Sequence, residues 1–308
     1  MKTLYNLLVI CLGFSIFLAG CSNFQSGGGQ PDNAGAEDNT KDDRLVRVQD
    51  YTGEGYTLRN GKETDKIAQE NKEAITKAVE TFFLEEYKTE VIVHNIVGAV
   101  DGATVFVESE GEPHFYTYAI IPIDVSQKKV LGGNVWTQEG QVENAIITGI
   151  FAMIFDQEFA KYEELVDEII AKHPVTGITE DALRNVRAGG HGNTFYYTNS
   201  YDPVFDQLVT TYLNNPNTTS EEWKSLFGKD DYSSRGFTLT LYLYMEDANA
   251  EPDEDIFNDI VSGLEKLDGI PKAYYSVILN DNFIDKTNAL GLKENSLRRS
   301  SPDYIIKE

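Results

Sequence analysis

The sequence has few of the residues that build disulfide-rich, zinc-binding or nucleic-acid-binding proteins. It contains two cysteines, four histidines, and 26 lysines and arginines against 50 aspartates and glutamates, for a net charge of −24. The cysteines, Cys11 and Cys21, both lie near the N-terminus. We therefore expect the rest of the chain to fold without disulfides. A chain of 308 residues can bury a core large enough for that.

The shortage of basic residues excludes some partners. Nucleic acids and anionic lipid headgroups are bound by patches of lysine and arginine. We therefore expect no nucleic-acid partner and no direct adhesion to headgroups. A strongly acidic surface suits a soluble exported protein, and it leaves cations or cationic molecules as the electrostatic attractions.

Sequence motifs for catalysis are also missing. There is no Gly-x-Ser-x-Gly elbow and no His-Glu-x-x-His motif, and no two histidines have the spacing of zinc ligands. Residues 53–64 (GEGYTLRNGKET) depart from a phosphate-binding loop in both spacing and final residue. Carboxylates are too numerous for an acid–base pair to stand out. The sequence predicts no catalytic residue, no metal and no cofactor, apart from a weak calcium candidate described below.

The one long apolar run lies at the N-terminus. Residues 4–20 follow Lys2 and are interrupted by Asn6 and Ser15, so the run is shorter than the roughly 20 residues of a membrane span. A basic start, an apolar stretch and small residues at its end indicate a signal peptide over residues 1–20. An uncleaved anchor is the alternative.

The end of this run, Leu18-Ala19-Gly20-Cys21, resembles the lipobox of bacterial lipoproteins. The resemblance implies a diacylglycerol thioether on Cys21 and cleavage before it. Residues 21–44 would then be the lipidated cysteine and a flexible tether, because the segment after Cys21 has too little apolar surface to offset its ordering entropy. The lipid on Cys21 would hold the protein on the extracytoplasmic face of the cell membrane.

The remaining residues, 45–308, predict an α+β domain. Its sheet would be mixed and largely antiparallel with helices packed on it, and it would include a C-terminal strand–helix–strand unit. The domain would be either a single body or two lobes with a boundary near Pro174–Gly192. Apolar residues at three- and four-residue steps predict helices at 64–87, 142–155, 159–170, 180–187, 203–213, 220–227 and 256–267. Alternating or β-rich runs predict strands at 90–97, 104–109, 114–124, 237–245 and 272–280.

Two loops carry the candidate sites. His191 lies in AGGHGN (residues 188–193), where glycines allow close backbone approach to a ligand or simply make a mobile loop. In the acidic loop Asp247–Asp255, Asp247, Asn249 and Glu251 have the 1-3-5 spacing of a calcium loop, but Pro252 replaces the required glycine. The same charges would also stabilise the N-terminus of the following helix.

The other histidines and the tyrosines have structural interpretations. We expect His94 to be a hydrogen-bonded core residue, His114 to be partly exposed, and His173 to interact with the last carbonyls of a helix. Tyrosines could line a face that binds sugars or peptides, or they could serve as ordinary strand residues. They cluster at Tyr116/Tyr118, Tyr196/Tyr197/Tyr201, Tyr242/Tyr244 and Tyr274/Tyr275.

Two segments, FFLEEYKTEVIVHNIVGAVDGATVFVESEGEPHFYTYAIIPID and VWTQEGQVENAI, are similar to an uncharacterised lipoprotein family of bacilli and staphylococci, domain of unknown function 1672. The resemblance covers most of residues 45–308 and the lipobox. It implies the surface of a Gram-positive cell. It assigns no catalytic or ligand-binding residue.

These observations favour a cell-surface lipoprotein with a non-catalytic binding or envelope-associated role. Its ligand would be a small molecule, a peptide or a component of the cell envelope, held in a cleft between the two sheet-bearing parts. An envelope-acting enzyme, with His191 or a carboxylate pair as general base, is the first alternative. A surface interaction module or adhesin, marked by an exposed tyrosine-rich patch, is the second.

Overall fold

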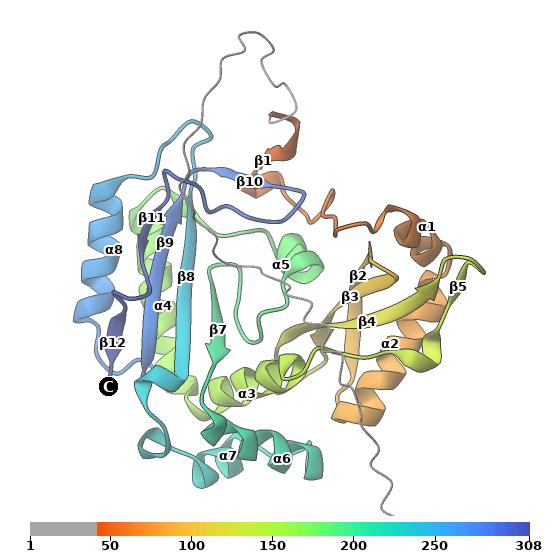
Figure 1. Ribbon diagram of the computed structural model, residues 1–308. Helices are drawn as coiled ribbons and strands as arrows, with labels where there is room; N and C mark the ends of the chain where they lie inside the picture. Colours follow the sequence, from red (N-terminus) through yellow and green to blue (C-terminus); the bar gives the residue numbers. More distant parts are fainter. Residues whose placement is uncertain (1–41) are drawn as a thin grey trace, which may run out of the picture. The chain divides into compact units, whose positions relative to one another are not determined.

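Two β-sheets and the helices packed on them make up most of the described part of the chain (Figure 1). The computed structural model describes residues 42–308, which belong to one compact unit. The predicted signal peptide, Cys21 and the tether up to residue 41 lie outside the described residues. Asp42–Arg44 form a 3-10 turn, η1, so the fold begins before the predicted boundary at residue 45. Within residues 42–308, no helix has the length and apolarity to cross a membrane.

The first sheet is the antiparallel meander predicted from residues 90–124, extended by one short strand. Its strand order is β2-β3-β4-β5. Val105 and Val107 of β3 are fully buried, as their alternation in the sequence predicts. Helices α1 and α2 pack against β2. The elements are α1 (Lys62–Glu70), α2 (Lys72–Tyr87), β2 (Val91–Ala99), β3 (Gly102–Ser109), β4 (Tyr116–Asp124) and β5 (Lys129–Val130).

The helical segment before this sheet differs from the prediction. A single helix was expected over residues 64–87, but the segment forms α1 and α2 with a break at Asn71. The Asn71 side-chain amide donates a hydrogen bond to the Ile67 carbonyl at 2.8 Å. An asparagine side chain that takes up a local backbone group in this way competes with the regular helical pattern.

The second sheet is built around the parallel pair β8 and β9, joined by α8, which confirms the predicted strand–helix–strand unit. β6 and β7 pair antiparallel with β8, and β11 and β12 pair antiparallel with β9. The strands are β6 (Val175–Thr176), β7 (Tyr196–Ser200), β8 (Phe237–Met245), β9 (Ala273–Asn280), β11 (Leu297–Arg299) and β12 (Ile305–Lys307). β7 was not predicted. The α+β class with a mixed, largely antiparallel sheet is confirmed.

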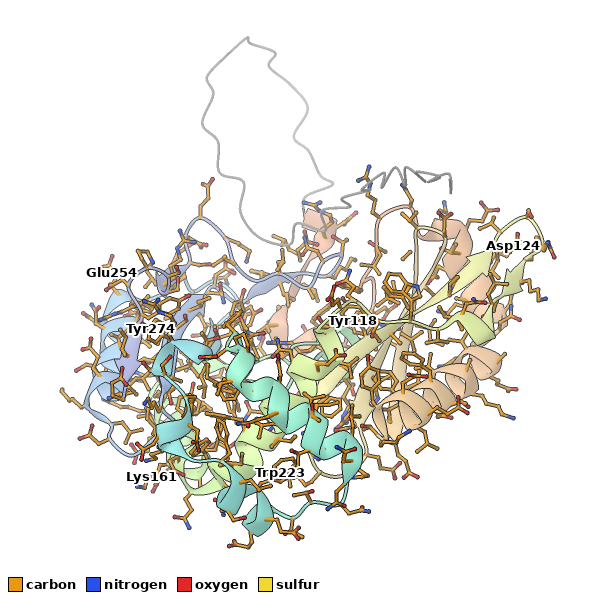
Figure 2. The ribbon with its side chains drawn as sticks, turned by 60° about the horizontal axis from the view of Figure 1, so that its bottom comes forward. Tyr118, Asp124, Lys161, Trp223, Glu254 and Tyr274 are labelled. Carbon is orange, nitrogen blue, oxygen red and sulfur yellow. The ribbon has the colours of Figure 1, made fainter. Side chains whose placement is uncertain are left out.

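Helix α3 connects the two sheets, because it contacts both β4 and β7. Phe151 of α3 stacks on Phe237 of β8, with ring centroids 3.7 Å apart. Helices α6 and α7 pack on α3, and Trp223 of α7 is buried there (Figure 2). The remaining helices are α3 (Gln141–Ile154), α4 (Asp156–Lys172), α5 (Glu180–Val186), α6 (Asp206–Asn214), α7 (Ser220–Leu226) and α8 (Glu254–Lys266).

A smaller hydrophobic cluster lies apart from the main core and contains residues from distant parts of the chain. Next to it, β1 (Leu45–Arg47) pairs with β10 (Phe283–Asp285). Helix α5 contributes Ala182 and Leu183, and β8 contributes Tyr244. This second cluster forms part of the wall of the site described next. Short 3-10 turns connect several elements: η2 (Val48–Asp50), η3 (Gly132–Asn134), η4 (Pro203–Phe205), η5 (Lys229–Asp231) and η6 (Ser234–Gly236).

Candidate functional site

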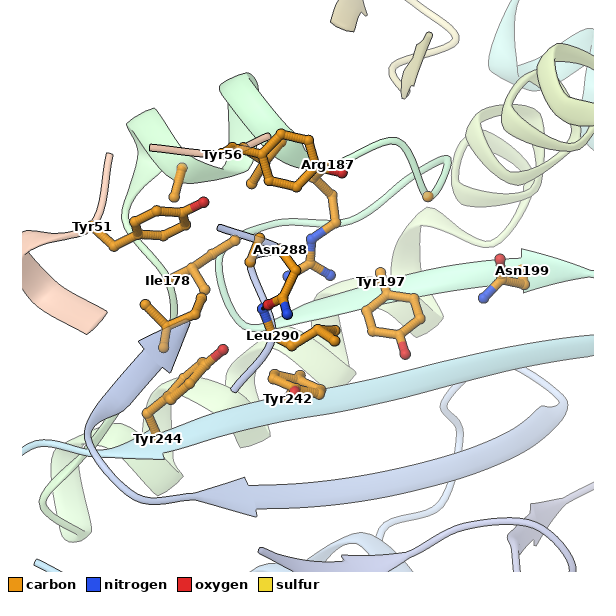
Figure 3. Close-up of a pocket in the computed structure, with 15 residues that line it drawn as sticks. Tyr51, Tyr56, Ile178, Arg187, Tyr197, Asn199, Tyr242, Tyr244, Asn288 and Leu290 are labelled. Carbon is orange, nitrogen blue, oxygen red and sulfur yellow. The ribbon is translucent and has the colours of Figure 1, made fainter. Parts of the chain in front are cut away.

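A cavity of about 300 Å³ lies beside the second hydrophobic cluster (Figure 3). Its walls come from α5, β7, β8, the segment after η2 and the loop after β10. Five tyrosines line it: Tyr51, Tyr56, Tyr197, Tyr242 and Tyr244. Arg187, Asn199 and Asn288 supply its polar side chains. We call this site the tyrosine cavity.

Strand β8 supplies two of the tyrosines through its alternation. Its apolar residues, such as Leu241 and Leu243, face the main core. Tyr242 and Tyr244 lie on the opposite face, with ring centroids 5.6 Å apart. Tyr197 of β7 pairs with Thr240, which shares that face, so all three tyrosines line one side of the sheet.

Four tyrosines of the cavity keep their phenolic protons at neutral pH. Burial raises the pKa of Tyr51, Tyr56, Tyr242 and Tyr244 above the usual tyrosine value. A phenol with a raised pKa keeps its proton in neutral solution. The cavity therefore offers flat apolar ring faces together with protonated hydroxyl groups.

Arg187, which follows α5, brings the one positive charge among the lining residues. Its guanidinium carbon lies 5.0 Å from the centre of the Tyr197 ring, which is cation–π geometry. In Figure 3 the guanidinium points toward the space between Asn288 and Tyr197. Within residues 42–308, no carboxylate lies within 4.0 Å of it.

A second polar cluster surrounds Glu108 of β3. The Glu108 carboxylate lies 2.7 Å from Nε2 of His94, 2.9 Å from Nε2 of His114 and 3.6 Å from Nε of Arg184. The hydroxyl of Tyr116 donates to the same carboxylate at 3.3 Å. Burial alone would raise the pKa of Glu108, but the hydrogen bonds from the two histidines outweigh it and hold the pKa below its usual value. We call these five residues the Glu108 cluster.

Two of the histidines considered in the sequence, His94 and His114, belong to the Glu108 cluster. His94 is hydrogen-bonded as predicted, at the β-bulge where β2 shifts register against β3. The side chain of His114 is about one-third exposed, as expected. Both histidines contact Glu108, so the cluster is complete within the chain.

His191 lies away from the tyrosine cavity. Its Nδ1 donates to the His114 carbonyl at 3.1 Å, and its backbone N–H donates to the Thr148 hydroxyl at 2.8 Å. The ring packs against Phe159, with centroids 5.4 Å apart. Burial lowers the pKa of His191 to about 4, so the imidazole is neutral at physiological pH. In the described part of the chain, no carboxylate is hydrogen-bonded to this ring.

The two remaining candidates have structural partners. The His173 imidazole contacts the Asp259 carboxylate at 2.8 Å, so the expected interaction with helix carbonyls is wrong for its side chain. In the acidic loop, Asp253 caps α8 by accepting a hydrogen bond from the Ile256 N–H. Glu251 accepts a hydrogen bond from the Asn295 side chain instead of converging with Asp247. Residues 42–308 contain no group of three or more His, Cys, Asp or Glu side chains arranged to hold a metal ion.

The structure brings together only some of the tyrosines that the sequence singles out. Tyr197, Tyr242 and Tyr244 converge on the cavity, whereas Tyr196 donates to Glu163 and Tyr118 donates to Gln138. Sequence reasoning missed Tyr51, Tyr56 and Arg187. The only signal for the convergence was the tyrosine face of β8.

Comparison with known proteins identifies the family. The model of a family of proteins of unknown function, DUF1672, matches residues 38–307. The chain belongs to the DUF1672 family. This confirms the resemblance found in the sequence, and no curated protein matches the chain.

A solved structure shares the fold. The crystal structure of a DUF1672 family protein from Staphylococcus aureus subsp. aureus Mu50 is similar, with a TM-score of 0.69 and 20% identity. The match covers 86% of this chain and 98% of that chain. At this identity the likeness extends to the fold of the DUF1672 family and assigns no role to the tyrosine cavity.

Proposed function

We propose that this DUF1672 protein is a lipid-anchored binding protein of the extracytoplasmic face, and that its ligand occupies the tyrosine cavity. One observation carries the proposal: a preformed cavity of about 300 Å³ is walled by five tyrosines and holds an arginine with no carboxylate beside it among residues 42–308. Ligand sites are concave, mostly apolar and aromatic, with a few polar groups that fix orientation.

The chemistry of the cavity suits binding more than catalysis. Its polar side chains are tyrosine hydroxyls, asparagine amides and one guanidinium, and none of these is an ordinary general base at neutral pH. The enzyme hypothesis relied on His191 or on a carboxylate pair as general base. The Nδ1 of His191 donates to a backbone carbonyl and its ring packs against Phe159, and no acidic residue lines the cavity. No specific observation favours that alternative.

The cavity can be tested by filling it. A Cβ added to Gly189, a lining residue, would meet Tyr197 at an ordinary contact distance of 3.9 Å, so Gly189→Leu should fold and extend its side chain into the cavity. Gly133→Leu is the matched control, because a Cβ there meets nothing within 4 Å. We expect compounds from a panel of sugars, peptides and aromatic acids to raise the melting temperature of the wild type and of Gly133→Leu. They should not raise that of Gly189→Leu. Equal shifts in all three proteins would rule out the cavity as the site.

The anchor is a separate part of the proposal. It rests on Leu18–Cys21 and on the apolar segment before them. Replacing Cys21 with alanine should abolish labelling by a fatty-acid probe and release the protein from the membrane. If Cys21→Ala is still labelled, the lipid is attached elsewhere and the lipobox interpretation is wrong.

A further inference from the structure

The tyrosine cavity differs in charge from the rest of the chain. The protein carries 50 acidic and 26 basic residues, but none of the residues that line the cavity is acidic and one is an arginine. A chain with this composition repels anions over most of its surface. The cavity wall instead presents a local positive charge.

The Arg187 guanidinium has no carboxylate partner within residues 42–308. Three arginines of the described chain pair with carboxylates: Arg44 with Asp285, Arg184 with Glu108 and Glu180, and Arg299 with Glu265. The other arginines of residues 42–308 without a carboxylate within 4.0 Å are exposed to solvent: Arg47, Arg59, Arg235 and Arg298. Arg187 is half-buried and has the Tyr197 ring beside it instead. A partly buried charge without a counter-charge is unfavourable, so a residue kept in this state needs an explanation.

The contact with Tyr197 does not supply a counter-charge to the guanidinium, which has no carboxylate within 4.0 Å among residues 42–308. The N–H donors of a guanidinium lie in its plane and form a fork. A carboxylate or phosphate pairs with that fork through two parallel hydrogen bonds. Figure 3 shows the guanidinium directed toward the region bordered by Asn288, Leu290 and Tyr197.

The rest of the wall fits a ring next to such an anion. Tyr242 and Tyr244 line the cavity from the sheet, with Tyr244 almost fully buried, and Tyr51 and Tyr56 approach from the opposite side (Figure 3). Aromatic side chains stack on flat rings, and their hydroxyl groups donate to oxygen atoms. The raised pKa values of these four tyrosines keep their hydroxyl groups protonated. The Tyr51 hydroxyl donates to the Lys286 carbonyl at 3.2 Å, so the donors left for a ligand are on the other tyrosines.

We infer that the tyrosine cavity binds a small ring-bearing organic anion, whose carboxylate or phosphate pairs with Arg187 and whose ring stacks among the tyrosines. This inference rests on the proposed function and specifies its ligand class. The anionic group supplies the counter-charge that the fold does not.

Three matched probes test it: phenylacetate, phenyl phosphate and the uncharged phenylacetamide. Binding is measured by saturation-transfer NMR titration with the full-length chain in a non-ionic detergent. The wild type is compared with Arg187→Gln, with Arg187→Lys, and with Arg184→Gln as the control arginine. Each variant is first checked for cooperative thermal unfolding well above the temperature of the titration. The comparison of the two anions shows which head group is preferred.

We expect at least one anion to bind the wild type and Arg184→Gln equally well, and to bind at least about tenfold more tightly than phenylacetamide. Arg187→Gln should lose about tenfold in affinity for that anion. Arg187→Lys should have an intermediate affinity, because lysine keeps the positive charge but lacks the paired N–H donors of the guanidinium. If phenylacetamide binds as tightly as the anions, or Arg187→Gln changes nothing, the anion inference is wrong while the cavity stands. If no probe binds any protein, both the inference and the proposed site fail.

Discussion

Arg184 and Arg187 are three residues apart at the end of α5, yet their surroundings are opposite. Arg184 has two carboxylates within 4.0 Å, those of Glu108 and Glu180. Arg187 has none among residues 42–308 and lies over a tyrosine ring at the edge of a cavity. The first belongs to the Glu108 cluster, and the second belongs to the tyrosine cavity.

This contrast separates a structural charge from one that is available for binding. In the Glu108 cluster, both carboxylate oxygens have donors from side chains of the same protein, so the cluster is complete without a ligand. In the tyrosine cavity, the guanidinium has no such partner. We expect changes to the first to alter stability, and changes to the second to alter binding.

The largest loss of stability is expected from a substitution in the Glu108 cluster. Glu108→Ala removes the acceptor of two histidines and a tyrosine from a site where the carboxylate side chain is 14% exposed. We expect the free energy of unfolding to fall by about 3 kcal/mol, because charge-assisted hydrogen bonds are lost and polar groups are left without partners. Urea denaturation measures it. Glu110→Ala, at an exposed neighbouring position, should change stability by less than about 0.5 kcal/mol. Equal losses in both variants would contradict the structural role of Glu108.

A smaller effect concerns His191, which supports the Glu108 cluster by its hydrogen bond to the His114 carbonyl. The pKa of His191 falls from 6.5 to about 4 in the folded protein. Between those values the unfolded chain binds a proton that the folded chain does not, so stability falls as the pH falls from 6.5 to 4. The full loss at pH 4 would be about 3 kcal/mol, at about 1.4 kcal/mol per pH unit, and partial exposure of the residue reduces it.

The variant His191→Gln isolates this contribution. It should flatten the curve of unfolding free energy against pH between 4 and 6.5. The acid loss that belongs to Glu108 should remain, because a carboxyl with a lowered pKa stabilises the fold above its unfolded value of 4.5 and loses that contribution as the pH falls below it. Parallel curves for the two proteins would show that His191 is not neutral in the fold.

The smallest effect on stability is expected at the arginines themselves. Arg187→Gln loses a cation–π contact of about 0.5 to 1 kcal/mol, but it also removes an unpaired charge, so the net change should lie within about 0.5 kcal/mol of zero. Arg184→Gln loses ion pairs that are 44% exposed on the arginine side, and it should cost up to about 1 kcal/mol. Thermal and urea unfolding measure the stabilities of the two variants. A clearly larger loss for Arg187→Gln would mean that Arg187 supports the fold.

Much of the fold could be predicted from local patterns, but the tyrosine cavity could not. The strict alternation of Phe237–Met245 and the apolar spacing of residues 256–267 each specify their element within a few residues, and both elements were predicted correctly. β7 was missed because Tyr196–Ser200 has no apolar alternation and follows a glycine-rich loop. Its position depends on pairing with β8, which is a long-range contact.

The cavity depends on contacts between residues that are still farther apart in the sequence. Tyr51, Tyr197 and Tyr244 meet there from positions nearly 200 residues apart, and no periodicity connects them. Arg187 looked like the last residue of a predicted helix. Its distinguishing property is that it is partly buried and has no carboxylate beside it in the described fold, and this combination exists only after the chain has folded. The tyrosine face of β8 was visible in the sequence, but a binding surface and an ordinary strand give the same pattern.

The most direct test of the contrast observes the two guanidinium groups themselves. The Nε–H resonances of Arg184 and Arg187 can be assigned by ¹H–¹⁵N NMR, with the two arginine-to-glutamine variants as references, and followed during titration with phenylacetate and phenyl phosphate. We expect the Arg187 resonance to move in a saturable way with at least one of the anions, while the Arg184 resonance stays in place. If Arg187 does not move, or both resonances move together without saturation, then Arg187 is not an anion-binding group.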